Sequence, residues 1–292
     1  MKSGIHYDVS MADYLALDAL SSGVCHALLS QSPLHAKYHK EHPDESNSAM
    51  DIGTIAHQIL LEGNQDGIVI VDADDWRTKA AKEQRDAAHA LGKAAVLAGK
   101  MAEILNMVDA AKAFVASSEI AGIFERGKPE VTLVWDDDGL LCKARPDFLP
   151  NDRSLILHVK TTQGSAEPES WIRNQLFSSG CDVAAVFYER GMNFEIHGDT
   201  VLANDAIQSV FIVIEQQPPY GCSLIGLDPM TRDNAERKVT RAIAKWRQCK
   251  ATSTWPCYPS QICYAETPAW ELAATERREL IDPVQQREGI QP

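Results

Sequence analysis

Apolar residues recur at helical spacing in the first part of the chain and form short unbroken runs in the middle. In the segment 51–62, Ile52, Ile55 and Ile59 share one face of a predicted helix. His57 falls near the buried edge of that face. The same reading predicts helices within 11–41 (two short ones) and over 51–62, 77–118, 168–178, 182–190 and 228–250, and strands at 68–71, 130–136, 140–148, 154–160 and 210–214.

This mixture of helices and strands predicts an α/β fold, with a mixed central β-sheet flanked by helices. The length of 292 residues and a hydrophobic content of 45% suit one decorated domain with a substantial core. The last residues, 273–292, are charged and predict a C-terminal tail.

Polar residues interrupt the apolar pattern at two neighbouring strands. Asp147 ends the strand that runs through Ala144, while His158 and Lys160 lie in a run that is otherwise apolar. Alternation places His158 and Lys160 on one face. A hairpin turning through 150–153 brings Asp147 beside them, so an acid, an imidazole and an ammonium converge.

These residue types suit cleavage of a phosphodiester. Carboxylate oxygens hold hard divalent cations such as Mg²⁺, and a nearby lysine orients water or meets the charge that develops on phosphate. The same residues also have a structural interpretation, in which Asp147 closes a turn while His158 and Lys160 are solvent-facing strand ends. The hairpin alone leaves both interpretations open.

Arg145-Pro146-Asp147 and the later Val159-Lys160-Thr161 resemble the motif of the PD-(D/E)xK nucleases, in the form found in RecE-type exonucleases, which are similar to exodeoxyribonuclease VIII. The likeness covers roughly residues 4 to 272 in the same order. Its other strings are Gly4 to Ser10, Asp51 to His57, Glu130 to Trp135, Gly139 to Asp147, Phe187-Tyr188 with Gly191, Glu215 to Tyr220, and Trp255-Pro256 with Pro268 to Trp270.

The resemblance implies a restriction-endonuclease-like core in a single domain over 1–272. Its helical N-terminal part spans about 1–120, and its catalytic core about 121–272. It further implies metal-dependent hydrolysis of linear double-stranded DNA from a 5′ end, in phage-type recombination, with Mg²⁺ as the cofactor and Mn²⁺ as an alternative. The implied partners are DNA ends, further copies in a ring-shaped homo-oligomer, and a single-strand annealing protein.

The resemblance also assigns the site residues of this chain. It implies that Lys160 orients the attacking water and that Tyr188 and Glu215 are further members of the site. The implied catalytic residues are Lys160, Asp147 and His158, and the implied metal ligands are Asp147, His57, Glu130, His158 and the carbonyl of Val159.

Two positions depart from the pattern of that family. His158 replaces the acid two residues before the lysine, and Ala184 replaces a glutamine four residues before Tyr188. Imidazole suits Mn²⁺, Fe²⁺ or Zn²⁺ better than Mg²⁺, and the exchange removes one negative charge. Two explanations stay open: a nuclease that has been weakened or inactivated, and a site that has shifted its ligands or its metal.

The net charge of −13 opposes broad nonspecific nucleic-acid binding, but a channel lined by a few basic residues is compatible with it. A helix-borne basic cluster is one candidate lining, although a solvated face explains it equally well. Its members are Arg77, Lys79, Lys82, Arg85 and Lys93. The start of the chain lacks an apolar stretch, so we expect no signal peptide, no membrane span and a cytoplasmic location.

Two other functions remain compatible with the sequence. A noncatalytic DNA-binding protein that keeps the nuclease fold accounts for His158 and Ala184 together. An endonuclease of the same superfamily is the other, because a fold does not fix its substrate.

Overall fold

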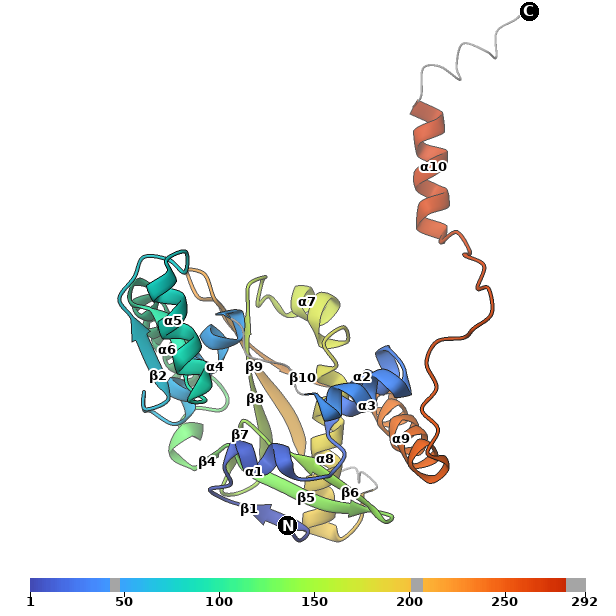
Figure 1. The fold of residues 1–292 in the computed structure, drawn as a ribbon, viewed down its shortest axis with the longest axis horizontal. Coiled ribbons are helices and arrows are strands. Elements are labelled where there is room, and N and C mark those ends of the chain that lie inside the picture. Colours follow the sequence, from blue (N-terminus) through green and yellow to red (C-terminus); the bar gives the residue numbers. More distant parts are fainter. Residues whose placement is uncertain (43–47, 201–206, 282–292) are drawn as a thin grey trace, which may run out of the picture. The chain divides into compact units, whose positions relative to one another are not determined.

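The computed structural model describes residues 1–42, 48–200 and 207–281. The chain divides into two units, Met1–Pro256 and Cys257–Pro292. Within the described residues, the first unit holds every strand and every predicted site residue (Figure 1).

The described strands form three sheets, ordered β1-β5-β6, β10-β9-β8-β7-β4 and β2-β3. β8 and β9 run parallel, as do β2 and β3, whereas the other paired strands are antiparallel. The strands are β1 Gly4–His6, β2 Ile68–Val71, β3 Ala94–Leu97, β4 Gly127–Pro129, β5 Thr132–Asp137, β6 Leu140–Ala144, β7 Phe148–Pro150, β8 Leu155–Thr162, β9 Gln208–Glu215 and β10 Cys222–Gly226.

Several helices begin at a polar cap, as at Ser32 and Asp228, whose side chains accept an amide hydrogen from the first turn. A short 3-10 helix spans Ile123–Glu125, and a π-helical turn spans Ile172–Leu176. The α-helices are α1 Met11–Ala16, α2 Ser22–Ser30, α3 Pro33–Glu41, α4 Ser48–Leu61, α5 Lys79–Ala90, α6 Ala98–Ala116, α7 Pro168–Trp171, α8 Cys181–His197, α9 Pro229–Thr252 and α10 Ala269–Ile281.

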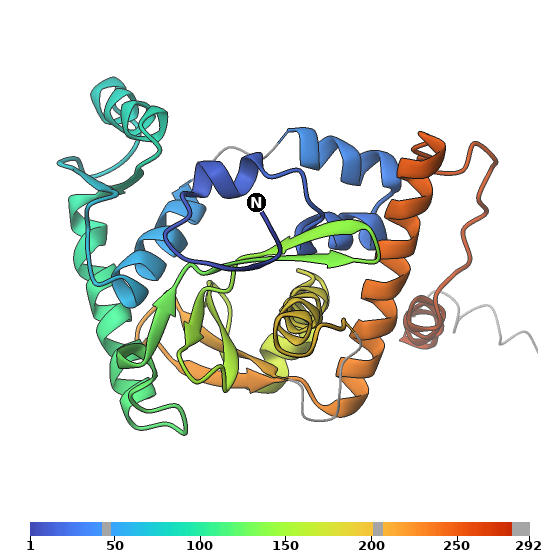
Figure 2. The ribbon, with the colours of Figure 1, turned by 90° about the horizontal axis from the view of Figure 1, so that it is seen from below.

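Helix α8 lies between the two larger sheets, as its end-on view in Figure 2 shows. The rings of Trp135 on β5 and Phe187 on α8 lie 4.9 Å apart, and both side chains are fully buried. Gly191 makes this approach possible, because a Cβ at that position would lie 2.7 Å from the Trp135 ring. Apolar residues of α4 and α6 form a second core with β8 and β9. The predicted α/β architecture is therefore confirmed.

The register of β7 and β8 confirms the predicted hairpin. Phe148 pairs with Leu157 in antiparallel orientation, so Asp147 lies opposite the segment that contains His158 and Val159. β8 continues to Thr162 alongside β9, where Thr162 pairs with Glu215. The ends of the parallel strands β8 and β9, which carry the polar residues Thr162 and Glu215, therefore lie side by side at one edge of the sheet.

The structure corrects three predicted elements. Residues 77–118 are not one helix: Gly92, at φ 67°, ends α5, and the apolar run 94–97 pairs as β3 with β2. Within 11–41 there are three helices, because Ser21 and Pro33 start new ones. Strand 140–148 is interrupted at 145–147, where the chain leaves one sheet and enters the other as β7.

In the second unit, α10 covers residues where a tail was expected, and 282–292 lie outside the described residues. Trp270, Leu272 and Leu280 are exposed. Across the described part of the chain, the helices are too short or too polar to cross a bilayer. The boundary expected at residue 272 stays a prediction.

Candidate metal centre

Three segments that are distant in the sequence bring His57, Glu130 and Asp147 together. His57 lies on α4, Glu130 lies between β4 and β5, and Asp147 precedes β7. His57 Nδ1 lies 3.4 Å from Glu130 Oε1, and His57 Nε2 lies 3.5 Å from Asp147 Oδ1. One ligand atom from each residue lies within 4.8 Å of the other two, so the three side chains face one small volume.

This donor set fits a divalent cation. Two carboxylates and one imidazole suit Mn²⁺ or Mg²⁺. The exposed fractions of 22% for His57, 23% for Glu130 and 17% for Asp147 leave the cluster within reach of solvent. Burial by itself lowers the pKa of His57, but Asp147 and Glu130 outweigh it, and the net shift is upward. The space between the carboxylates therefore favours positive charge.

Asp147 is held by the strand opposite it. Its Oδ2 accepts a hydrogen bond of 2.6 Å from the amide nitrogen of Val159 and lies 3.9 Å from Lys160 Nζ. Burial alone would raise the pKa of Asp147, but the Lys160 ammonium and His57 hold it well below its usual range. Asp147 is thus a fixed carboxylate whose Oδ1 remains directed at His57.

Glu130 is positioned by Arg145, a residue to which the sequence assigned no role. Arg145 Nε donates a hydrogen bond of 2.5 Å to Glu130 Oε2, while its Nη1 donates to the Val9 carbonyl and to Thr132 Oγ1. Glu130 adopts φ 51°, and its amide donates to the Asp147 carbonyl over 3.1 Å. In the sequence, the sign that Arg145 belongs to the site is its position two residues before Asp147.

Lys160 borders the cluster and is 39% exposed at its side chain. The Asp147 carboxylate is the main cause that raises the pKa of Lys160, so its ammonium stays protonated. An exposed, permanently charged ammonium beside a candidate cation site can meet an anionic substrate.

His158 lies in the core, and its side chain is not part of the cluster. It is 2% exposed and stacks on Phe211, with ring centroids 4.8 Å apart. Its Nε2 lies 3.2 Å from Ser209 Oγ. Burial is the main cause that lowers the pKa of His158 to about 4, so the ring is neutral near pH 7.

The remaining predicted residues lie at different distances from the cluster. Tyr188 contacts His158, with ring centroids 5.1 Å apart, and after burial Asp147 is the next cause that raises its pKa. Ala184 precedes it by one turn of α8. Glu215 accepts the Ala166 amide over 2.8 Å, so it fastens the loop that follows β8. The Asp147 carboxylate of the cluster therefore acts on the Tyr188 hydroxyl.

Three of the five residues in the basic cluster near α5, namely Arg77, Lys79 and Arg85, lie beside acids. Arg77 lies 3.5 Å from Asp75, and Arg85 lies 2.9 Å from Asp86. Such exposed pairs resemble a solvated helix face more than a phosphate channel.

Comparison with protein families decides the classification. Residues 21–268 match the family described as "PDDEXK-like domain of unknown function (DUF3799)". The chain belongs to this family. Its mixed α/β core and its cluster beside Lys160 therefore lie on a PDDEXK-like nuclease fold. No curated protein matches the chain.

Two solved structures are similar to this PDDEXK-like protein. The first, from Eubacterium rectale and provisionally described as an exonuclease, aligns with a TM-score of 0.55 at 10% identity over 92% of this chain and 99% of its own. That similarity supports the fold. The second, SSO0001, covers 74% of this chain and 98% of its own at 15% identity, with a TM-score of 0.28 that is too low for any structural conclusion.

Proposed function

We propose that this PDDEXK-like protein is a metal-dependent deoxyribonuclease whose cation is held by His57, Glu130 and Asp147. The observation that carries this proposal is the convergence of their ligand atoms within 4.8 Å, beside a lysine 3.9 Å from Asp147. When bound, a divalent cation supplies Lewis acidity to the phosphoryl group and lowers the pKa of water.

The side chains of this chain divide the remaining tasks. Asp147 and Glu130 are fixed by Val159 and Arg145, so their free oxygens need little reorganisation to accept a cation. Lys160 orients the attacking water and neutralises charge on the phosphate. The Val159 amide points at Asp147, and in a strand the carbonyl of the same residue points to the same edge. This orientation supports the Val159 carbonyl as a further ligand.

The polarity of cleavage is a finer proposal. We infer a 5′-to-3′ exodeoxyribonuclease acting on the ends of linear double-stranded DNA in phage-type recombination. The sequence resemblance to RecE-type exonucleases supports it, as does the Eubacterium rectale neighbour that is provisionally described as an exonuclease. With it come two proposed associations: a ring-shaped homo-oligomer and a single-strand annealing protein.

We further propose that the cation is Mn²⁺ more readily than Mg²⁺ and that activity is weakened. His158 stands where the family pattern has an acid, so the site lacks a third carboxylate, and because the ring is buried and neutral it adds no charge in its place. Ala184 likewise leaves no amide one turn before Tyr188. The same two residues support a second candidate, a noncatalytic DNA-binding protein on a nuclease fold.

The test is cleavage of linear duplex DNA with 5′ phosphates, beside a closed-circle control, in Mg²⁺ and in Mn²⁺. The chain is compared with His158→Asp, and thermal unfolding of both proteins checks that they fold. If the unmodified chain cleaves linear DNA in Mn²⁺ and leaves closed circles intact, the result supports the exonuclease. If only His158→Asp cleaves DNA, the result supports an inactivated site. Cutting of closed circles indicates an endonuclease. Binding without cleavage by either folded protein indicates the noncatalytic candidate and contradicts the nuclease.

A further inference from the structure

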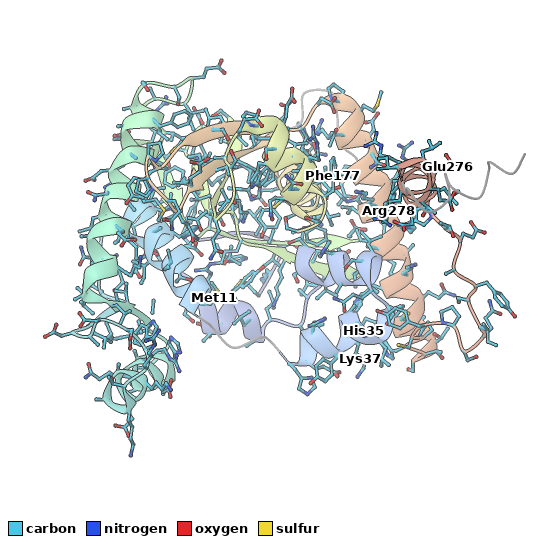
Figure 3. The ribbon with its side chains drawn as sticks, turned by 90° about the horizontal axis from the view of Figure 1, so that it is seen from above. Met11, His35, Lys37, Phe177, Glu276 and Arg278 are labelled. Carbon is cyan, nitrogen blue, oxygen red and sulfur yellow. The ribbon has the colours of Figure 1, made fainter. Side chains whose placement is uncertain are left out.

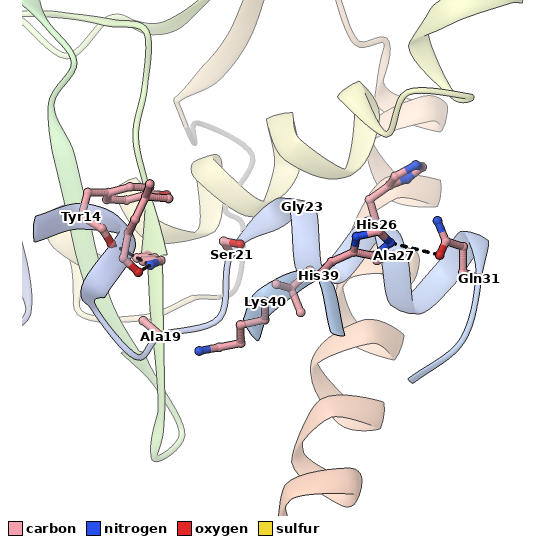
Figure 4. A pocket seen from close by; sticks show the side chains of 12 residues that line it. Tyr14, Ala19, Ser21, Gly23, His26, Ala27, Gln31, His39 and Lys40 are labelled. Atoms are coloured by element: carbon pink, nitrogen blue, oxygen red, sulfur yellow. Dashed lines mark hydrogen bonds between the residues drawn. The ribbon is translucent and has the colours of Figure 1, made fainter. Parts of the chain in front are cut away.

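A second feature of the first unit is a cavity of about 390 Å³ beside α2. Figure 4 shows the lining side chains, which come from several segments: Tyr14 from α1, His26 from α2, and His39 and Lys40 from α3. The titratable lining residues are Tyr14, His26, His39, Lys40 and Lys143. None of the described lining residues is Asp or Glu, although the chain holds 41 acidic and only 28 basic residues.

The two lysines reach the cavity from different elements, and their ammonium groups differ in how many N–H donors are already used in hydrogen bonds. Lys143, on β6, gives its hydrogen bonds to the carbonyls of Tyr14, Leu15 and Leu17, so it contributes charge. Lys40, on α3, donates to Asp18 over 2.5 Å. Asp18 is 75% exposed, and a lysine ammonium has three donors, so Lys40 retains donors for another acceptor.

The first turn of α2 adds to this positive character. Ser21 and Gly23 line the cavity, and the Ser21 side chain accepts no amide hydrogen from the helix that it precedes. The amide hydrogens of an uncapped first turn favour an anion. Burial is the main cause that lowers the pKa of Lys143 to about 8, and the neighbouring Lys40 ammonium lowers it further. Two ammonium groups thus repel each other in this cavity, and an anion between them would relieve the repulsion.

Tyr14 connects this cavity to the candidate metal centre. Its ring lies 4.7 Å from Lys143 Nζ and 5.6 Å from the Arg145 guanidinium, and Arg145 in turn bonds Glu130. We propose that this cavity, the α2 groove, binds a phosphate group of the DNA strand that enters the metal centre. The proposal rests on the proposed function for its choice of ligand, and it makes Lys40 a DNA-binding residue.

A charge-matched pair of variants on one helix tests this proposal. Lys40→Glu places a carboxylate in the α2 groove. Lys37→Glu makes the same charge change on α3 (Figure 3), where Lys37 pairs with Glu41 and does not line the groove. Binding of labelled duplexes ending in 5′ phosphate or 5′ hydroxyl is measured by fluorescence anisotropy in Ca²⁺, over a range of salt.

We expect Lys40→Glu to weaken binding at least about tenfold beyond Lys37→Glu and to reduce the salt slope by about one. A loss confined to phosphorylated ends identifies the terminal phosphate, and an equal loss on both ends identifies an internal phosphodiester. Equal effects of the two variants, or no binding by the unmodified chain, overturn the proposal. The milder pair Lys40→Ala and Lys37→Ala repeats the comparison if Lys40→Glu unfolds.

This design separates the α2 groove from the nuclease. Lys40-dependent binding by a protein that cuts nothing would overturn the proposed function and leave the α2 groove standing. Cleavage that Lys40→Glu affects no more than Lys37→Glu, with equal binding, would overturn the α2 groove alone.

Discussion

Arg145 holds Glu130 by a hydrogen bond of 2.5 Å to Oε2, which leaves Oε1 facing His57. The guanidinium is itself fixed by the Val9 carbonyl and Thr132 Oγ1. Arg145 is therefore a positioning residue for the candidate metal centre, since it acts through Glu130.

Arg145→Gln is expected to weaken Mn²⁺ affinity by about 10- to 100-fold, as loss of outer partners of metal ligands does. Arg145→Lys should recover part of the affinity, because it keeps the charge and loses the planar fork. Titration calorimetry with Mn²⁺ measures both variants. Equal affinities for all three proteins, at equal thermal stability, would contradict the positioning role.

Asp147→Asn and Lys160→Met should separate cation binding from chemistry. The first removes a ligand charge, so the stabilisation of folding by Mn²⁺ should disappear from thermal unfolding curves. The second should keep that stabilisation yet lose about 10²- to 10³-fold in cleavage rate. A Lys160→Met protein that cleaves at the unmodified rate would remove Lys160 from the mechanism.

His158→Leu is expected to leave Mn²⁺ affinity unchanged, because the ring is buried against Phe211 and bonds Ser209 outside the cluster. Its effect on folding should stay near the value of one hydrogen bond, about 0.5–1.5 kcal/mol. Calorimetry and urea unfolding measure the two quantities. A large fall in Mn²⁺ affinity would instead identify His158 as a ligand.

Lys143 should make stability rise with pH. Its folded-state pKa of about 8 lies below its ordinary value of 10.5, so between these values the unfolded chain binds the extra proton. The contribution of Lys143 to the free energy of unfolding therefore increases as pH rises from about 8 to 10.5, and it is constant below that range. Urea unfolding of the protein and of Lys143→Met from pH 7 to pH 10 measures the difference in slope. Parallel slopes would show that the pKa of Lys143 is not depressed.

The sequence predicted helices and strands correctly where the spacing of apolar residues agreed with the residues that begin or end an element. Strand 68–71 was predicted with its observed ends, and the hairpin that places Asp147 opposite β8 was correct. The prediction failed at 94–97, where four apolar residues become a strand only because β2 is available as a partner. Pairing of this kind depends on neighbours that are distant in sequence, so local propensity does not report it.

For the site, the sequence by itself determined which residue types are present and that Asp147 lies at the start of a hairpin whose second strand carries Lys160. A short turn joins the two strands of this hairpin, and the length of that turn, which fixes how the strands pair, can be predicted from the sequence. Only the tertiary structure decided that α4 carries His57 to Glu130 and Asp147, that Arg145 holds Glu130, and that His158 turns into the core. These outcomes depend on packing between distant segments: burial of the His158 ring against Phe211 competes with exposure at the cluster, and no periodicity in the sequence ranks the two.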